Sequence, residues 1–338
     1  MTRRAKLYSK IPVAEAIKRG WIEGSSNIDV LEKRVCDFLG IANIDEEPAM
    51  PHVARKSAPY ATSSPALRAW ICRARQLAPL VPVDGRYRAG SMKNLLGEIG
   101  ALLFAAAETK RATRILAKYG VRLVVVETTS KAKVDGVTTW LDDHSPVVAL
   151  SLRYDRIDWF WFTLMHELVH VSRGEGKTAP VIDRDLEAEQ LPKNEIDANE
   201  TAQDWLVPHA EMAGFIARTA PLYSRMEIER FARRINVHPG VVVGQLHRRK
   251  EFDYKYHRGF LVKIRAAIIA GTVTDGWGIR PLAASTKRLP STGGDPLRST
   301  GIASGEAGRE QPFRDRSTRG RGVPQLVGRA RRGRHAGG

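Results

Sequence analysis

The alternation of apolar and polar positions divides the chain into helical segments on both sides of a short run of strands. Apolar residues recur at helical spacing over residues 10–45, 66–80 and 92–119, the first as a helical hairpin and the last broken near Lys110. Three short apolar runs separated by polar turns are typical of strands, at residues 121–126, 136–141 and 146–152. The pattern predicts an α+β fold, mostly helical, with a small sheet of about three strands packed on helices.

One predicted helix is apolar nearly all round. It runs from about Asp158, a candidate N-cap, through four consecutive aromatic residues to Ser172, and Gly174 follows its end. A helix with no polar face is typically buried inside a protein. We therefore expect this segment to form the centre of the molecule.

That helix contains the sequence His166-Glu167-Leu168-Val169-His170. Residues four apart lie on one helix face, so both imidazoles can bind one metal ion, while Glu167 lies beside the metal and can take a proton from water. The motif predicts a zinc site with Glu167 as the catalytic base and His166 and His170 as ligands. The alternative is a pair of hydrogen-bonded core histidines, but burying three such polar groups without a metal would be costly.

A third protein ligand is expected from the next predicted helix. Its apolar face is formed by Ala198, Ala202, Trp205 and Leu206. At 100° per residue Glu195 falls on this face, Asp197 and Asp204 lie at its edge, and Glu200 points away. We therefore predict Glu195 as the ligand, with Asp197 as the alternative. Asn199, one turn beyond Glu195, is predicted to accept the outer N–H of a ligating histidine.

Composition limits where the protein acts. No stretch is long and apolar enough for a membrane span, and the amino terminus lacks a signal-peptide pattern, so we expect a cytoplasmic protein that does not contact membranes. The two cysteines, Cys36 and Cys72, fall in apolar helical patterns and are expected to be buried thiols.

The formal net charge of +17 is concentrated toward the end of the chain. From Lys287 onward there are twelve basic and four acidic residues among many Gly, Arg, Ser and Pro. Such a segment cannot bury enough apolar surface to fold, so we expect residues 281–338 to form a disordered basic tail, with nonspecific polyanion binding as the alternative.

A second candidate for nucleic-acid contact is the segment 226–250, which has the helix, turn and helix layout of a DNA reader. The positions that would read bases are occupied by Val241, Val242 and Val243. DNA therefore remains a candidate partner without a clear reader helix. We expect the two helices to pack beside the metal site instead.

Taken together, these motifs resemble the ImmA/IrrE family of metallopeptidases, which often occur within HigA-like antitoxin regulators. The resemblance runs from about Lys10 to Gly278. It rests on two metal motifs, the first being His166-Glu167-Leu168-Val169-His170 and the second Glu195-Ile196-Asp197-Ala198-Asn199. Further matches are Ile11-Pro12-Val13, Lys18-Arg19-Gly20-Trp21, His238-Pro239-Gly240, Val243-Gly244 and Asp275-Gly276-Trp277-Gly278. In the family the two histidines and the first glutamate of the second motif bind zinc, which agrees with Glu195. Similar members usually begin with a helix-turn-helix domain, and this sequence starts just after where that domain would end.

The resemblance implies a zincin-like peptidase domain at residues 61–215, with a helical segment and linker at 1–60 and a helical subdomain at 216–280. It also implies a zinc-dependent endopeptidase that cleaves a regulatory protein, held in extended form along a sheet edge that we place at residues 146–152. The alternative function is an antitoxin or transcription regulator with a structural zinc site and a toxin partner. An intact Glu167 favours the peptidase, because a structural site needs no proton shuttle.

Overall fold

The computed structural model describes residues 2–46, 64–129, 132–183 and 192–281. These described residues belong to one compact unit. Residues 47–60, at the end of the segment predicted as helices and linker, and nearly all of the predicted basic tail lie outside the described residues. Among the described residues, no helix is long and apolar enough to cross a membrane.

Helices precede the sheet along the chain, as the apolar spacing predicts. The first are α1 (Arg3–Lys10), α2 (Val13–Lys18), α3 (Ile28–Leu39) and α5 (Pro65–Leu77). The helix predicted over 92–119 is interrupted, and forms α6 (Met92–Gly100), the 3₁₀ helix η3 (Ala106–Arg111) and α7 (Ala112–Lys118). Two single 3₁₀ turns, η1 (Ala78–Leu80) and η2 (Ala89–Ser91), complete this part.

The sheet is mixed and has five strands among the described residues, two more than the sequence predicts. These are β1 (Arg122–Val126), β2 (Gly136–Trp140), β3 (Pro146–Leu150), β4 (Val181–Asp183) and β5 (Val273–Asp275), in the order β4-β2-β3-β1-β5. Strand β1 is parallel to β3 and β5, whereas β2 is antiparallel to β3 and β4. The two additional strands have three residues each, too short for an alternating pattern to mark them.

One prediction about the sheet is wrong. The segment 146–152 was expected to be an edge strand, but β3 lies between β2 and β1 and pairs with both. All five residues of β3 are buried, because a central strand is covered on both faces. Within the described residues, the edges of the sheet are instead β4 and β5.

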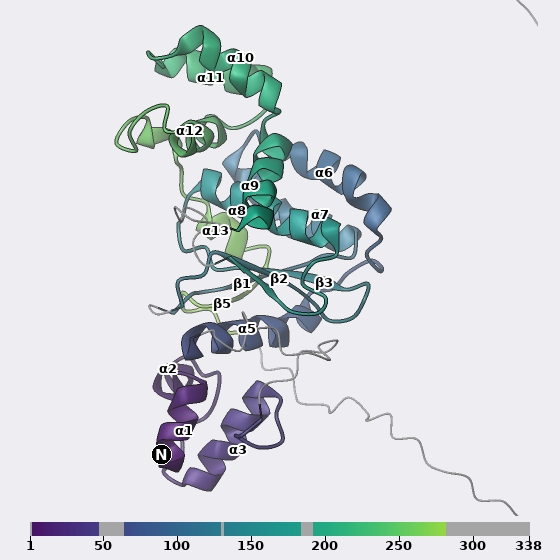
Figure 1. The fold of residues 1–338 in the computed structure, drawn as a ribbon, viewed down its shortest axis with the longest axis vertical. Helices are drawn as coiled ribbons and strands as arrows, with labels where there is room; N and C mark the ends of the chain where they lie inside the picture. The colour runs from purple at the N-terminus through teal and green to yellow at the C-terminus, as the bar shows by residue number, and fades with distance from the viewer. Residues whose placement is uncertain (1, 47–63, 130–131, 184–191, 282–338) are drawn as a thin grey trace, which may run out of the picture. The chain divides into compact units, whose positions relative to one another are not determined.

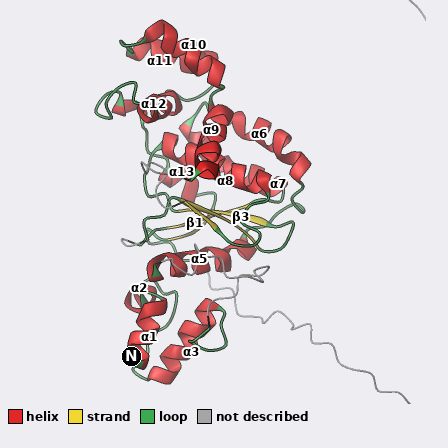
Figure 2. Cartoon of the chain, viewed as in Figure 1, coloured by secondary structure: helices red, strands yellow, loops and turns green. Residues whose placement is uncertain are grey.

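The two faces of the sheet belong to two hydrophobic cores. Leu123 and Val125 of β1 pack in the core that contains α8 (Ile157–Arg173), whereas Val124 and Val126 pack in the core formed with α1, α2, α3 and α5. This alternation follows from the two-residue period of a strand. Figure 1 shows α5 covering one face of the sheet and α7 and α8 the other, and Figure 2 shows the strands as a layer between these helices.

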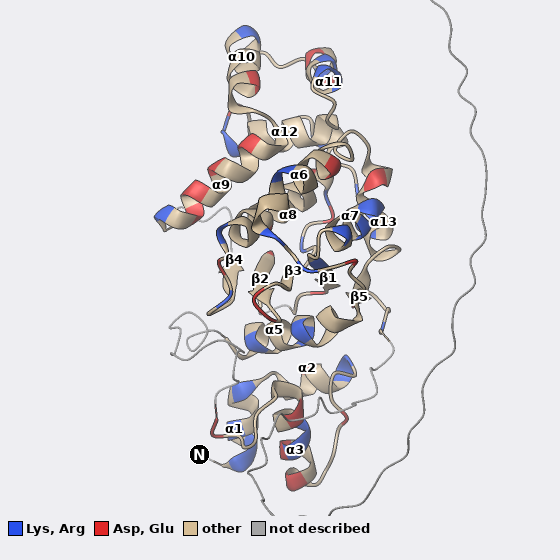
Figure 3. Cartoon of the chain, turned by 90° about the vertical axis from the view of Figure 1, so that its right-hand side faces the viewer, with Lys and Arg blue, Asp and Glu red and all other residues tan. Residues whose placement is uncertain are grey.

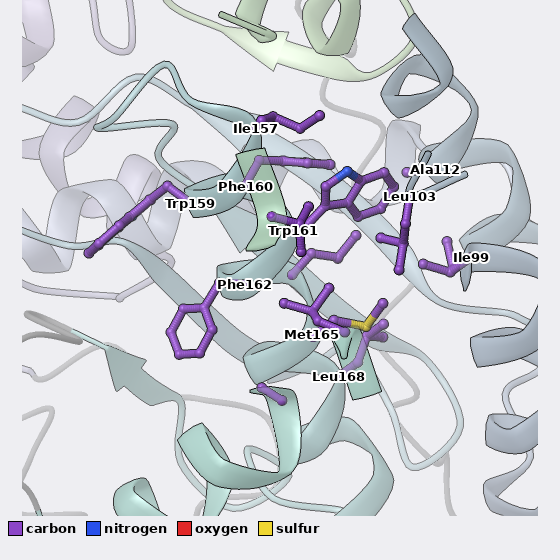
Figure 4. Close-up of a cluster of buried hydrophobic side chains, with 14 of the residues drawn as sticks. Ile99, Leu103, Ala112, Ile157, Trp159, Phe160, Trp161, Phe162, Met165 and Leu168 are labelled. Carbon is purple, nitrogen blue, oxygen red and sulfur yellow. The ribbon is translucent and has the colours of Figure 1, made fainter. Parts of the chain in front are cut away.

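Helix α8 is buried along almost its whole length, as predicted. It begins at Ile157, after Arg156 as N-cap, so Asp158 lies in the first turn and pairs with Arg156 instead of capping the helix. Trp161 and Met165 pack toward Ile99 and Leu103, and Figure 4 shows this cluster of buried side chains. Gly174 adopts the left-handed conformation that ends the helix, also as predicted.

Four helices follow β4: α9 (Lys193–Leu206), α10 (His209–Thr219), α11 (Arg225–Arg234) and α12 (Pro239–Arg248). The 3₁₀ turn η4 (Arg258–Phe260) and the short helix α13 (Arg265–Ile269) lead to β5. In α12, Val241, Val242 and Val243 are each at most 1% exposed and belong to the core that contains α8. The α11–α12 pair therefore packs beside the central helix, and its second helix does not present these valines to a DNA groove.

Candidate metal centre

Helix α8 carries the two histidines and the glutamate of the first motif. His166, Glu167 and His170 are all fully buried. The helix has few charges elsewhere, and Figure 3 shows it mostly without charged residues while several acidic residues mark α9. Three ionisable side chains therefore lie together in an apolar helix, where each needs a partner for its polar atoms.

Helix α9 brings Glu195 to the same point. Its Oε2 atom lies 3.2 Å from Nε2 of His166 and 3.5 Å from Nε2 of His170, and the two histidine nitrogens are 2.9 Å apart. Small Ala198 and Ala202, both fully buried, let α9 pack closely against α8. The structure therefore brings together the three residues that the sequence predicts as ligands, from helices separated by β4.

These three side chains fit a metal ion. Their ligand atoms all lie within 4.8 Å of one another. Ligands in a tetrahedral zinc site with bonds of about 2.0–2.1 Å are about 3.4 Å apart, close to the three separations seen here. In addition, Oε2 of Glu195 is buried without a hydrogen-bond partner among the described residues. Two imidazoles and a carboxylate that converge in this way are a donor set that suits a divalent cation.

The charge of Glu195 also suits a cation. Burial alone raises the pKa of its carboxyl group, but contacts with His166 and His170 outweigh burial, so the pKa is lowered below its ordinary value. Its other oxygen, Oε1, accepts a hydrogen bond from Nδ2 of Asn194 at 2.7 Å. The carboxylate is therefore ionised at neutral pH, which is the form that binds metal.

The other residues considered for the site lie differently. Asp197, the alternative ligand, is exposed, as are Glu200 and Asp204. Asn199 is buried, but its Oδ1 atom has no hydrogen-bond partner among the described residues. The bond predicted from a histidine N–H to Asn199 is therefore not formed in this structure.

Glu175, which sequence reasoning missed, contacts the outer nitrogen of His170. Its Oε2 atom lies 2.5 Å from Nδ1 of His170. A carboxylate at Nδ1 holds the proton there, and leaves the lone pair of Nε2 facing Glu195 and His166. The residue follows Gly174 at the end of α8, and an acidic residue at that point, five positions after His170, was the available signal.

The carboxylate of Glu167 contacts strand β2 of the sheet. Its Oε2 atom accepts a hydrogen bond from Oγ1 of Thr138 at 2.6 Å, and the same hydroxyl lies 3.1 Å from the backbone oxygen of Glu167. A Cβ atom built on Gly136 would lie 2.0 Å from Oε1 of Glu167. Strand β2 therefore provides both the donor and the space for this carboxylate.

The fold and the site together define an α+β domain of the metallopeptidase type, with two histidines and a glutamate on a central helix and an acidic residue supplied by the next one. Residues 117–247 match the model of a peptidase family described as the IrrE N-terminal-like domain. The match spans the end of α7, strands β1 to β4 and the helices from α8 to α12, and it supports a metallopeptidase-like domain of the ImmA/IrrE type in this part of the chain. Comparisons with curated proteins and with solved structures found no match.

Proposed function

We propose that the chain is a zinc-dependent endopeptidase that hydrolyses a peptide bond in a regulatory protein. The observation that carries the proposal is the convergence of His166, His170 and Glu195, with the carboxylate of Glu167 on the same turn of α8 held by Thr138. This arrangement supplies a place for a metal ion and a base beside it. The match to a peptidase family supports the same reaction.

The residues of the chain divide the work of hydrolysis. His166, His170 and Glu195 would hold zinc, which when bound supplies a Lewis acid that polarises the scissile carbonyl and acidifies water. Glu167 accepts a proton from the attacking water and donates it to the departing amine. Glu175 fixes the orientation of the His170 ring through Nδ1. The apolar surroundings strengthen each of these electrostatic contacts.

A protein substrate can add to the sheet as a further strand. Strand β4 is an edge strand among the described residues, and it pairs with β2, the strand that contacts Glu167. An extended peptide on this edge would run close to the metal centre and bind through its backbone. We propose this edge for substrate binding, in place of the interior strand β3.

The second candidate is an antitoxin or transcription regulator with a structural zinc site, partnered by a toxin or DNA. A structural site is commonly closed by four ligands and does not need an adjacent carboxylate. Here three ligands converge and Glu167 lies on the same helix. In addition, the positions that would read DNA are occupied by Val241, Val242 and Val243. These side chains are buried and are not available at the surface. These observations favour the peptidase.

The test compares wild type with Glu167→Gln. Cells expressing each form are compared for newly formed protein termini by mass spectrometry, and the zinc content of both purified proteins is measured. The variant should keep zinc and lose the new termini, because general acid–base catalysis contributes about 10²- to 10⁴-fold. If the variant retains zinc and produces the same termini and biological effects as wild type, the peptidase proposal is wrong.

A further inference from the structure

Three alternate residues of strand β2, Gly136, Thr138 and Trp140, face helix α8. Side chains two apart along a strand project from the same face of a sheet. Gly136 and Thr138 contact Glu167, and Trp140 packs in the core that contains α8. On the opposite face, Val137 packs in the other core and Thr139 contacts Arg75 of α5.

The first two of these residues fix the carboxylate of Glu167. Thr138 donates a hydrogen bond of 2.6 Å to Oε2, the short distance expected for a bond to a charged acceptor. At Gly136 any side chain would overlap Oε1, so only glycine leaves the space that the carboxylate occupies. The base is therefore held from two sides by one strand.

Trp140 acts on the metal ligands by a different route. Its Nε1 donates a hydrogen bond of 2.7 Å to the backbone oxygen of Glu175, whose carboxylate contacts Nδ1 of His170. The neighbouring Gly176 (φ +84°) lies so close to β2 that a Cβ atom there would be 2.7 Å from the backbone oxygen of Thr138. The loop after α8 is thus fixed on β2 at the point where it presents Glu175.

We propose that this face of β2 is a positioning surface with two separable roles: Thr138, with the space at Gly136, aligns Glu167 for proton transfer, and Trp140 aligns Glu175 and through it His170 for metal binding. The inference rests on the proposed peptidase function only for the role of Thr138. The role of Trp140 concerns metal affinity and stands apart from the reaction. No residue of this surface is itself a ligand or a proton carrier.

The test uses matched substitutions on the two faces of the sheet in the full chain. Thr138→Val removes the hydroxyl that contacts Glu167, and Thr139→Val makes the same change on the opposite face. Trp140→Phe removes the donor to Glu175, and Trp70→Phe removes an equivalent indole bond, to the backbone oxygen of Val126, from α5. Zinc affinity is measured by competition with a chelator, and stability by thermal unfolding of the metal-free proteins.

Thr138→Val should lower kcat by about 10-fold or more on a substrate found by the comparison of termini, with KM and zinc affinity unchanged, because one bond to a charged acceptor is lost. Thr138→Ser should restore turnover. In a crystal structure of Thr138→Val the carboxylate of Glu167 should leave β2. Thr139→Val should keep turnover. The role of Thr138 is overturned if the two valine variants have the same kcat, or if Glu167 stays in place without the hydroxyl.

Trp140→Phe should weaken zinc binding by about 5-fold, the equivalent of one neutral hydrogen bond, while Trp70→Phe lowers stability without changing zinc affinity. Equal zinc affinities for the two phenylalanine variants would overturn the role of Trp140. If the wild-type chain hydrolyses no protein, the proposed peptidase function is wrong, but that result does not decide the roles of Thr138 and Trp140. The crystal structure and the zinc affinities then still decide whether β2 positions Glu167 and Glu175.

Discussion

At the residue scale, the choice between Glu195 and Asp197 as the third ligand leads to a direct prediction. Glu195→Ala should lose zinc, because Glu195 is the acid that reaches both histidines, whereas Asp197 is exposed on another side of α9. We expect zinc affinity to fall by more than about 100-fold, beyond the usual effect of removing an outer-shell partner. Metal content after dialysis measures the change. Asp197→Ala is the matched control and should keep zinc. If Asp197→Ala loses zinc and Glu195→Ala retains it, the assignment is reversed.

A buried histidine outside the site predicts a pH dependence of stability. Burial lowers the pKa of His247 below its ordinary value near 6.5, and its Nε2 atom lies 3.1 Å from the backbone oxygen of Tyr256. The unfolded chain therefore takes up a proton near pH 6.5 while the folded state does not. The neutral, buried His247 costs no stability above pH 6.5, and the free energy of unfolding falls as the pH drops below that value.

Thermal unfolding of metal-free protein at pH 7.5 and 5.5 measures this effect. His247→Gln should lose less stability between the two pH values than wild type does, because it has no imidazole to protonate. The exposed His144→Gln is the control, since water surrounds that side chain before and after unfolding. An identical loss of stability in wild type and His247→Gln would contradict the prediction.

The sequence was sufficient for the residues that lie on regular helices. Helical spacing predicts that His166 and His170 share a face and places Glu195 on the inner side of its helix, because that geometry is set by position along the chain. The sequence pattern could not predict that Glu175, Thr138 and Gly136 contact the residues of the site. Their roles depend on how a loop and a strand pack against α8, and no local pattern encodes that packing.

At the scale of elements, the sequence predicts the strands that form clear apolar runs. It misses β4 and β5, which have three residues each. Strands β1, β2 and β3 lie within one or two residues of the predicted limits. Strand order, in contrast, depends on pairing between distant segments: β5 joins β1 from about 150 residues further along the chain. Strand β3 is central because β1 pairs with β3 and β2 also pairs with β3, and no local pattern encodes the pairing of β1 with β3.

The burial of α12 also predicts the effect of a substitution on stability. Val242 is fully buried against the core that contains α8. Val242→Ala should lower the free energy of unfolding by about 2 kcal/mol, because methyl groups are lost and a cavity remains. Urea denaturation of wild type and variant measures this change in the free energy of unfolding. In a DNA-reading helix this residue would face solvent, and the substitution would have the small effect expected for Arg230→Ala, an exposed position on α11.

At the scale of the whole molecule, the helices near the amino terminus share a core with the sheet. Trp21 donates a hydrogen bond of 3.3 Å from Nε1 to Oδ1 of Asp275, and Arg73 binds Oδ2 of the same carboxylate at 2.5 Å. Two motifs that lie 254 residues apart in the sequence thus meet beside β5. Val35, from α3, is fully buried in the core that also contains Val124 of β1. These contacts favour joint unfolding of the N-terminal helices and the sheet.

The two buried cysteines can test whether the boundary expected near residue 60 separates two domains. Cys36 lies in α3 and Cys72 in α5, one on each side of that boundary, and both are free thiols. Because their helices share one core, both thiols should become reactive at the same denaturant concentration, which thiol labelling with mass spectrometry measures. Asp275→Ala leaves the charge of Arg73 largely buried and unpaired, so it should lower the free energy of unfolding by about 3 kcal/mol or more and shift both labelling midpoints together to lower denaturant concentration. Labelling of Cys36 well before Cys72 would show that the N-terminal helices unfold independently of the sheet.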